Sequence, residues 1–353
     1  MGSKTSSRGF VSLAATTATF FAVVLVAACA PAPINPPATT TTTTTVSSTT
    51  TVPATTTTTT EAPTTTTTTV APACDTVSAT VTVGTFPFGV ASDGTNIWVT
   101  NTGSNTVSKI NPATNTVTST VNVGSIPIRV AFDGTNLWVT NYGSNTVSKI
   151  DPNTNTVTAT VAVGTVPFGV ASDGTNIWVT NTGSNSVSKI NPGTNTVTAT
   201  VAVGTGPVGV AFDGTNIWVS NFDSNSVSKI DPNTNTVTAT VDLGSSQVGV
   251  MFDGTNIWIT NRANNAVSKI NPNTNTVTAT VAVGTGPREL AFDGTNIWVT
   301  NQGSASVSKL DPNTNSVTAT VAVGSAPEGL AFDGTNIWVV NAGFNNVSKI
   351  PVC

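Results

Sequence analysis

Residues 127–166 read PIRVAFDGTNLWVTNYGSNTVSKIDPNTNTVTATVAVGTV, and this stretch of forty residues decides the fold. Close copies of it follow one another from residue 87 to the end of the chain, so the seven tryptophans lie forty residues apart, at positions 98, 138, 178, 218, 258, 298 and 338. A strict period of this length is typical of stacked or circular arrays of one small unit. The structure of that unit then determines the architecture.

The unit contains four short runs rich in Val, Ile, Thr, Phe and Trp, which are the residues favoured in strands. Between the runs lie Gly, Asn, Asp and Pro residues, which tolerate or preset the backbone angles of tight turns. In the unit quoted above, the runs are Pro127–Asp133, Asn136–Asn141, Thr146–Asp151 and Thr156–Val163. Four antiparallel strands in forty residues make one twisted propeller blade.

The two ends of the repeat region complement each other. The last unit stops after its third run, Val347–Ile350, and the first folded residues, Thr76–Val83, match the fourth run of the other units. A stacked solenoid would instead need polar capping units, but the terminal units keep the full apolar pattern. The sequence therefore predicts an all-β, seven-bladed propeller of four-stranded antiparallel blades, closed by an N-terminal strand that completes the last blade.

The positions of two cysteines support this closure. The span from Cys74 to Cys353 is 280 residues, seven times the period, so the two residues occupy neighbouring positions of the N/D-P-x-T-N turn. An even pair of cysteines in an oxidising compartment favours a disulfide. We predict that Cys74 and Cys353 are bonded to each other at the seam of the ring.

The chain of 353 residues divides into three zones of different composition. Residues 1–28 have basic residues followed by an apolar run, the layout of a signal peptide. Residues 29–73 are almost wholly Thr, Pro, Ala and Ser, which predicts a disordered, lipid-anchored stalk that can carry O-linked sugars. Residues 74–353 have the composition of a globular domain and form the predicted propeller, which we expect to be monomeric.

The end of the apolar run indicates how the chain is anchored. Val26–Cys29 (VAAC) resembles the processing box of bacterial lipoproteins, which implies cleavage before Cys29 and lipidation of that residue. The alternatives are ordinary signal cleavage near Ala30 and an uncleaved membrane anchor. We expect an exported protein that is lipid-anchored at the cell surface, or else secreted. No later run is long enough to cross a bilayer, so the lipid anchor is the only expected membrane contact.

The charged residues argue against several functions. Lys4, Arg8 and Glu61 precede residue 74, which leaves 10 of the 12 basic and 15 of the 16 acidic residues in the propeller. Nucleic-acid binding depends on neutralising phosphates, so a net charge of −5 without a basic cluster makes it unexpected. The chain has no histidine, and disulfide-bonded cysteines are not nucleophiles. We therefore predict no catalytic residue and no cofactor.

A repeated aspartate allows a metal-binding alternative. Each D-G-T-N connection begins with an aspartate, such as Asp133. A ring of these carboxylates would suit Ca²⁺, but recurrence in every unit favours a turn residue that accepts hydrogen bonds from its own backbone. We predict no metal site.

The segment Asn96–Asn101 (NIWVTN), with VTVG before it and VSKI after it, resembles the YVTN-type β-propeller repeat, with Trp in place of Tyr. This resemblance covers residues 74–353 and implies a bacterial surface or periplasmic propeller, in a family whose members mostly have no assigned activity. The P-x-G-x-A and D-G-x-x-W-x-T segments are also similar to those of the seven-bladed streptogramin lyases. The lyase resemblance implies a catalytic histidine, which this chain does not have.

Variation among the units concentrates in two connections, one after the fourth run and one between the second and third runs. In an up-and-down blade both connections emerge on the same side of the disc. We interpret this side as a binding surface, since exposed aromatic and arginine side chains are favoured in interfaces; the alternative is drift in weakly constrained loops. An aromatic arc is expected on the first four blades and a charged arc on the last three, from the residues Phe86, Phe88, Ile128, Arg129, Tyr142, Phe168, Phe222, Arg262, Arg288, Glu289, Glu328 and Phe344.

Three functions fit these patterns. The first is a non-enzymatic cell-surface binding or scaffold protein that presents its variable side to a protein or glycan partner. The second is a lyase- or lactonase-like enzyme with a metal at the channel mouth, where Glu289 and Glu328 are the main carboxylates. The third is a structural spacer of a surface layer.

Overall fold

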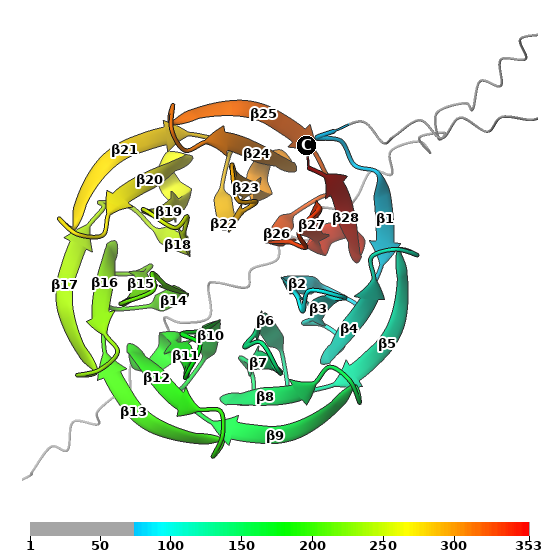
Figure 1. Cartoon of the computed structure of the whole chain (residues 1–353), viewed down its shortest axis with the longest axis horizontal. Coiled ribbons are helices and arrows are strands. Elements are labelled where there is room, and N and C mark those ends of the chain that lie inside the picture. Colours follow the sequence, from blue (N-terminus) through cyan, green and yellow to red (C-terminus); the bar gives the residue numbers. More distant parts are fainter. Residues whose placement is uncertain (1–73, 353) are drawn as a thin grey trace, which may run out of the picture. The chain divides into compact units, whose positions relative to one another are not determined.

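The computed structural model describes residues 74–352, which form a ring of seven four-stranded antiparallel sheets (Figure 1). The predicted seven-bladed propeller is therefore confirmed. The predicted signal peptide, stalk and lipidated Cys29, like Cys353, lie outside the described residues. Across residues 74–352, no helix has the length and apolar character needed to cross a membrane.

Each blade has an innermost strand at the channel, two middle strands and an outermost strand at the rim (Figure 1). The innermost strands are β2 (Pro87–Ser92), β6 (Pro127–Phe132), β10 (Pro167–Ser172), β14 (Pro207–Phe212), β18 (Gln247–Phe252), β22 (Pro287–Phe292) and β26 (Pro327–Phe332). The second strands are β3 (Ile97–Asn101), β7 (Leu137–Asn141), β11 (Ile177–Asn181), β15 (Ile217–Asn221), β19 (Ile257–Asn261), β23 (Ile297–Asn301) and β27 (Asn336–Asn341).

The outer half of each blade follows the same order. The third strands are β4 (Thr106–Asn111), β8 (Thr146–Asp151), β12 (Ser186–Asn191), β16 (Ser226–Asp231), β20 (Ala266–Asn271), β24 (Ser306–Asp311) and β28 (Asn346–Pro351). The outermost strands are β5 (Thr116–Asn122), β9 (Thr156–Ala162), β13 (Thr196–Ala202), β17 (Thr236–Asp242), β21 (Thr276–Ala282), β25 (Ser316–Ala322) and β1 (Ala79–Thr82). Short 3₁₀ turns follow four of the second strands, as η2 (Thr182–Ser184), η3 (Arg262–Asn264), η4 (Gln302–Ser304) and η5 (Ala342–Phe344).

The ring closes through β1, which is the outermost strand of the seventh blade and pairs antiparallel with β28. Ahead of this strand, the Asp75 amide donates to the carbonyl of Pro351 over 3.1 Å. Closure by an N-terminal strand is therefore confirmed. Cys74 is disulfide-bonded, but its pairing with Cys353 stays a prediction, because Cys353 lies outside the described residues.

The core lies between the blades, and all seven tryptophans are fully buried in it. Trp98 packs against Leu137 and Val139 of the next blade. Its indole nitrogen donates to Asp93 Oδ2 over 2.7 Å, and every other blade repeats this bond over 2.6–2.7 Å. Asp93 Oδ1 also accepts from the backbone amides of Thr95 and Asn96. The predicted turn role of the aspartate is confirmed, and the turn also satisfies the polar atom of the buried indole.

The strand order divides the connections between two faces of the disc. We call the side with the D-G-T-N and N/D-P-x-T-N turns the invariant face, and the opposite side the variable face. The chain enters the ring on the invariant face, because Asp75 has the left-handed backbone (φ 55°) of the turn asparagines such as Asn115 (φ 56°). Asp75 also accepts from Lys309 Nζ at 3.0 Å, as Asn155 accepts from Lys109 over 3.1 Å.

Candidate functional site at the variable face

The two variable connections interlock on one face. Within the first blade, the Thr102 amide donates to the carbonyl of Phe86 over 3.0 Å. The Phe86 amide in turn donates to Asn345 Oδ1 of the preceding blade over 2.9 Å. The same pattern recurs around the ring, for instance from Ile126 to Asn105. The prediction that both connections lie on one side of the disc is confirmed.

The arginines and glutamates of the propeller all gather at the channel end of this face. The repeated unit has only Lys and Asp as charged residues, so every Arg and Glu after residue 74 is a departure from it. Electrostatic interactions link them into one group drawn from the second, fifth, sixth and seventh blades. With the amide that bridges them, they form what we call the central charged cluster: Arg129, Arg262, Arg288, Glu289, Gln302 and Glu328.

One ion pair spans the channel. Arg129 of β6 pairs with Glu289 of β22, although the second and sixth blades are separated by two blades on the shorter way round the ring. The guanidinium carbon of Arg129 lies 5.0 Å from the ring centre of Phe88 and 5.7 Å from that of Phe168. The two phenyl rings contact each other edge to face, with centroids 5.7 Å apart. An arginine held by a carboxylate and two aromatic rings thus crosses one end of the channel.

The rest of the cluster is organised by Gln302 of η4. Its Oε1 accepts from Arg262 Nη2 over 3.2 Å and from Arg288 Nε over 3.1 Å, while its Nε2 donates to Glu328 Oε1. Arg288 Nε also lies 3.5 Å from Glu328 Oε2. Burial raises the pKa of Glu328 above its ordinary range, although Arg288 opposes the change. Burial likewise lowers the pKa of Arg288, and Glu328 opposes that.

Part of the predicted binding surface is not exposed. Phe88 is 8 % exposed, Ile128 is 0 % and Glu328 is 4 %. The sequence interpretation placed them in surface connections and was wrong. They follow the first residue of an innermost strand, where the ladder shows an irregularity, so their side chains turn into the ring. The remaining predicted residues are exposed or partly exposed at Phe86, Arg129, Tyr142, Phe168, Phe222, Arg262, Arg288, Glu289 and Phe344.

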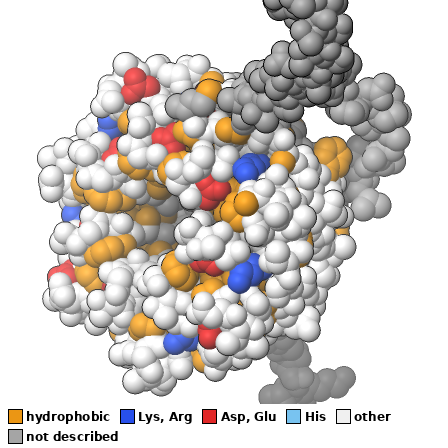
Figure 2. Space-filling view, turned by 45° about the vertical axis from the view of Figure 1, so that its right-hand side comes forward, with side chains coloured by type: hydrophobic (Ala, Val, Ile, Leu, Met, Phe, Trp, Pro, Cys, Tyr) orange, Lys and Arg blue, Asp and Glu red, His pale blue; other side chains and the backbone are white. Residues whose placement is uncertain are grey.

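Figure 2 shows the disc hollowed at its centre, with apolar and charged side chains around the hollow. Arg262, Arg288, Glu289 and Glu328 lie together, in agreement with the predicted charged arc. The sequence interpretation missed that Arg129 joins them from the second blade. Arg129 and Glu289 both replace the glycine of the P-x-G segment, so they occupy equivalent positions in their blades. This shared position is the sequence feature that could have indicated their proximity.

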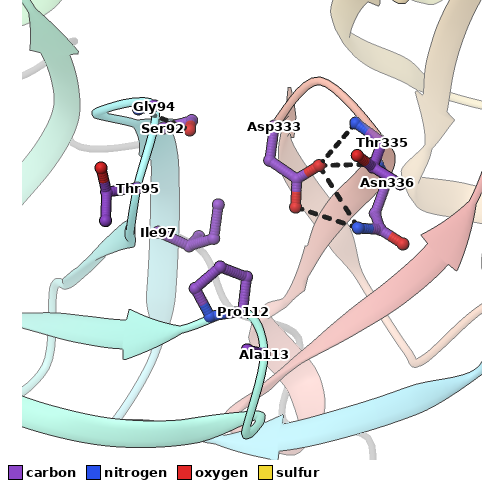
Figure 3. A pocket seen from close by; sticks show the side chains of 9 residues that line it. All are labelled: Ser92, Gly94, Thr95, Ile97, Pro112, Ala113, Asp333, Thr335 and Asn336. Carbon is purple, nitrogen blue, oxygen red and sulfur yellow. Dashed lines mark hydrogen bonds between the residues drawn. The ribbon is translucent and has the colours of Figure 1, made fainter.

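A pocket of about 220 Å³ lies on the invariant face at the seam between the first and seventh blades (Figure 3). It exists where Ser92 replaces the phenylalanine that five other blades have at this position. Its carboxylate, Asp333, already accepts from the amides of Thr335 and Asn336 and from the indole of Trp338. The pocket therefore offers no carboxylate free to bind a ligand.

A second hollow, of about 330 Å³, lies on the variable face where the fourth, fifth and sixth blades meet. Its walls are Phe222, Ser246, Arg262, Ala263, Asn265 and Gly286. Among residues 74–352 there is no group of three or more Cys, Asp or Glu side chains arranged to hold a metal. Glu289 and Glu328, the carboxylates of the enzyme hypothesis, each face an arginine.

No family model matches this chain, and no curated protein is similar enough in sequence to match it. Similar solved structures include hydrazine synthase from Kuenenia stuttgartiensis, at 22 % identity and a TM-score of 0.70, covering 77 % of this chain and 97 % of that chain. A streptogramin B lyase matches at 17 % identity and a TM-score of 0.68, covering 78 % of this chain and 97 % of that chain. The selenomethionine-substituted virginiamycin B lyase from Staphylococcus aureus matches at 18 % identity and a TM-score of 0.67, covering 78 % and 99 %. The expected likeness in fold to the streptogramin lyases is confirmed, and at these identities the likeness extends to the fold alone.

Proposed function

We propose that this chain is a non-enzymatic, exported binding protein that presents the variable face of its propeller to a protein or glycan partner at the cell surface. One asymmetry carries the proposal. The chain enters the ring on the invariant face, and the departures from the repeat concentrate on the opposite face. A domain tethered in this way directs its non-repeated side chains away from its attachment.

Exposed aromatic side chains support a partner-binding role. Phe86 is 53 % exposed and Phe344 is 57 % exposed, the largest values among the large apolar side chains of the described residues. They belong to neighbouring connections, because the Phe86 amide is bonded to the residue after Phe344. Exposed aromatic side chains that lie together are typical of interaction surfaces.

The central charged cluster favours binding over catalysis. The pair of Arg129 and Glu289 crosses the channel end, where a substrate of a channel-mouth enzyme would have to enter. Both carboxylates of the cluster are engaged by arginines, and Glu328 is buried as well. The cluster thus fixes the shape of the face and leaves the surrounding connections to contact a partner.

An enzyme of the lyase class is the second candidate, and one observation favours it. Glu328 is a buried carboxylate with a raised pKa inside an ionisable cluster, and such perturbed groups concentrate at catalytic sites. A protonated Glu328 would act as a general acid. Incubation of the full chain with streptogramin B, followed by mass spectrometry, tests this candidate. Intact streptogramin B is the expected result, and turnover abolished by Glu328→Gln would overturn the non-enzymatic proposal.

The binding proposal is tested with the immobilised full chain, a glycan array and cell-envelope extracts. Changing Phe86 and Phe344 together to serine should reduce partner binding by at least about tenfold, because buried aromatic anchors dominate interface energies. The matched control changes Val277 and Val317 to serine, which are exposed by 42 % and 38 % on rim strands. Equal loss in both variants, or no loss in either, would contradict the proposal.

A further inference from the structure

We infer that the hollow between the fourth, fifth and sixth blades binds a sugar that carries a carboxylate. The inference rests on the proposed binding role of the variable face and names a ligand class for one part of it. The hollow has a volume of about 330 Å³, which is in the range of small-ligand sites.

Arg262 supplies the charge that selects a carboxylate. Of the three arginines in the propeller, Arg129 and Arg288 have a glutamate partner, whereas no carboxylate of the described residues lies within ion-pair distance of Arg262. Among the described residues, the hydrogen-bond partner of its guanidinium is Gln302 Oε1, through Nη2. A guanidinium has five N–H donors in a planar fork. Arg262 lines the hollow, and its remaining donors suit a bidentate carboxylate.

Asp223, in the connection that also holds Phe222, does not take this role. Asp223 follows Phe222 in the connection between β15 and β16, and it is exposed. Its carboxylate lies over Gly206, where an added Cβ would collide with Oδ2. It makes no ion pair with Arg262. Asp223 instead places a negative charge near the hollow, which weakens the binding of any anion there.

The other walls favour a sugar ring over a peptide. Phe222 is an aromatic wall, and the apolar face of a sugar ring packs on such a side chain. Ser246, Ala263 and Gly286 are small and leave room for a compact ring. The hollow lies between connections of three blades, so it has no free strand edge of the kind that binds an extended peptide.

The fifth blade carries unusual buried polar groups beside the hollow. Gln247 stands where the other six blades have proline, and its Oε1 and Nε2 are buried without hydrogen-bond partners. The Oγ of Ser245 is in the same situation. These two residues flank Ser246, which lines the hollow. Buried polar atoms without partners reduce stability, so this connection departs from the other six at a cost to the ring.

The test is calorimetric titration of the full chain with glucuronate, with glucose as the uncharged match and acetate as the carboxylate without a ring. Glucuronate should bind, and glucose and acetate should bind at least tenfold more weakly, or too weakly to detect. Arg262→Gln should reduce glucuronate affinity at least tenfold and Phe222→Ala at least fivefold. Asp223→Asn should increase it, because a like charge is removed.

Arg262→Lys keeps the charge without the fork and should give an intermediate loss, which keeps the test valid if Arg262→Gln does not fold. Lys229→Gln on the invariant face is the control and should leave affinity unchanged. Glucose binding as tightly as glucuronate, acetate or an acidic peptide competing equally well, or unchanged affinity in Arg262→Gln would each overturn the inference. If glucuronate does not bind but the Phe86 and Phe344 variant still loses its partner, only this inference fails and the proposed function stands.

Discussion

On the invariant face, every blade makes the same contacts: an aspartate holds its own turn and an indole nitrogen, and a lysine reaches the next blade. On the variable face the backbone hydrogen bonds between the two connections also repeat, but the side chains differ from blade to blade, and the central charged cluster joins four blades through contacts that occur once. Both faces are built from the same forty-residue unit. The difference teaches that contacts repeated seven times maintain the ring, whereas contacts made once are the candidates for function.

The two faces also differ in how completely their charged and polar side chains are paired. The carboxylates of the D-G-T-N turns each accept several hydrogen bonds. The variable face instead has Arg262 without a carboxylate partner and Gln247 with unpartnered polar atoms. If the comparison holds, substitutions on the invariant side lower stability without changing binding. Substitutions on the variable face do the reverse, except where they break a buried pair.

The largest expected effect is loss of the disulfide at the seam. With Cys353 as the partner, Cys74→Ser should lower the free energy of unfolding by up to about 5 kcal/mol, because so long a closed loop restricts the unfolded chain strongly. Urea denaturation measures the change. If Cys74 and Cys353 are bonded to each other, Cys353→Ser and the double variant give the same loss as Cys74→Ser. Additive losses would show that the two cysteines are not partners.

The next largest effect concerns the buried indoles. Trp218→Ala should cost about 3–5 kcal/mol, since it leaves a cavity between blades and removes the indole hydrogen bond to Asp213. Val237→Ala, at an exposed site on the rim of the same blade, is the control and should cost less than about 0.5 kcal/mol. Partner binding by the folded fraction should be unchanged. A binding loss beyond the unfolded fraction would break the division between the faces.

The ion pair of Arg129 and Glu289 lies on the variable face but is largely buried, so its substitution should change stability as a core substitution does. Arg129→Met leaves Glu289 largely buried and unpaired, which should cost on the order of 3 kcal/mol. Changing both residues to methionine should cost less than Arg129→Met alone, because an apolar pair replaces the ion pair. A double-mutant cycle by denaturation measures the coupling. Strict additivity would show that the pair contributes nothing.

The faces should also respond to pH in opposite directions. A backbone hydrogen bond from Asn153 lowers the pKa of Asp151 below its ordinary 3.8, so its contribution to stability is lost as the pH falls through the lowered pKa. Burial raises the pKa of Glu328 above its ordinary 4.5, so its contribution is present below that value and lost as the pH rises through the folded pKa. Glu328→Gln should therefore remove a decline in the free energy of unfolding as the pH rises above the ordinary pKa of 4.5. Denaturation across the pH range checks this, and an unchanged decline would contradict it.

The smallest effect belongs to the repeated lysines. Lys149 Nζ lies 5.3 Å from the ring centre of Trp138 and donates to the carbonyl of Pro192. Lys149→Met should cost about 0.5–1 kcal/mol. Lys309→Met should cost slightly more, since Lys309 pairs with the charged Asp75 at the seam. Equal losses of stability would mean that Lys309 contributes no more at the seam than Lys149 does in its own blade.

Most of the fold could be predicted from the sequence because each blade is specified by short-range patterns. The strands predicted at Pro127–Asp133 and Thr156–Val163 are observed as Pro127–Phe132 and Thr156–Ala162. Closure of the ring could be predicted because the last unit lacks its fourth strand and the first folded residues supply one. The turn residues and the repeat period can both be recognised in a single sequence, since each depends on neighbouring residues.

The site could be predicted only in part. Sequence variation located the face, but it placed Phe88 and Ile128 on the surface, because the bend at the start of the innermost strands cannot be seen in the period. The pairing of Arg129 with Glu289 depends on which blades face each other across a ring of seven and on the reach of two long side chains. Neither quantity is encoded in the spacing of residues.

The position of Cys74 ahead of β1 has a mechanical consequence. A pull arriving from the N-terminal side reaches the sulfur atom of this disulfide-bonded residue before it reaches any hydrogen bond between β1 and β28. The chain would otherwise separate from β28 one bond at a time, starting with the bond from the Asp75 amide to the Pro351 carbonyl. If the partner of Cys74 is Cys353, the covalent bond carries that load to the end of β28 and relieves the pairing of β1.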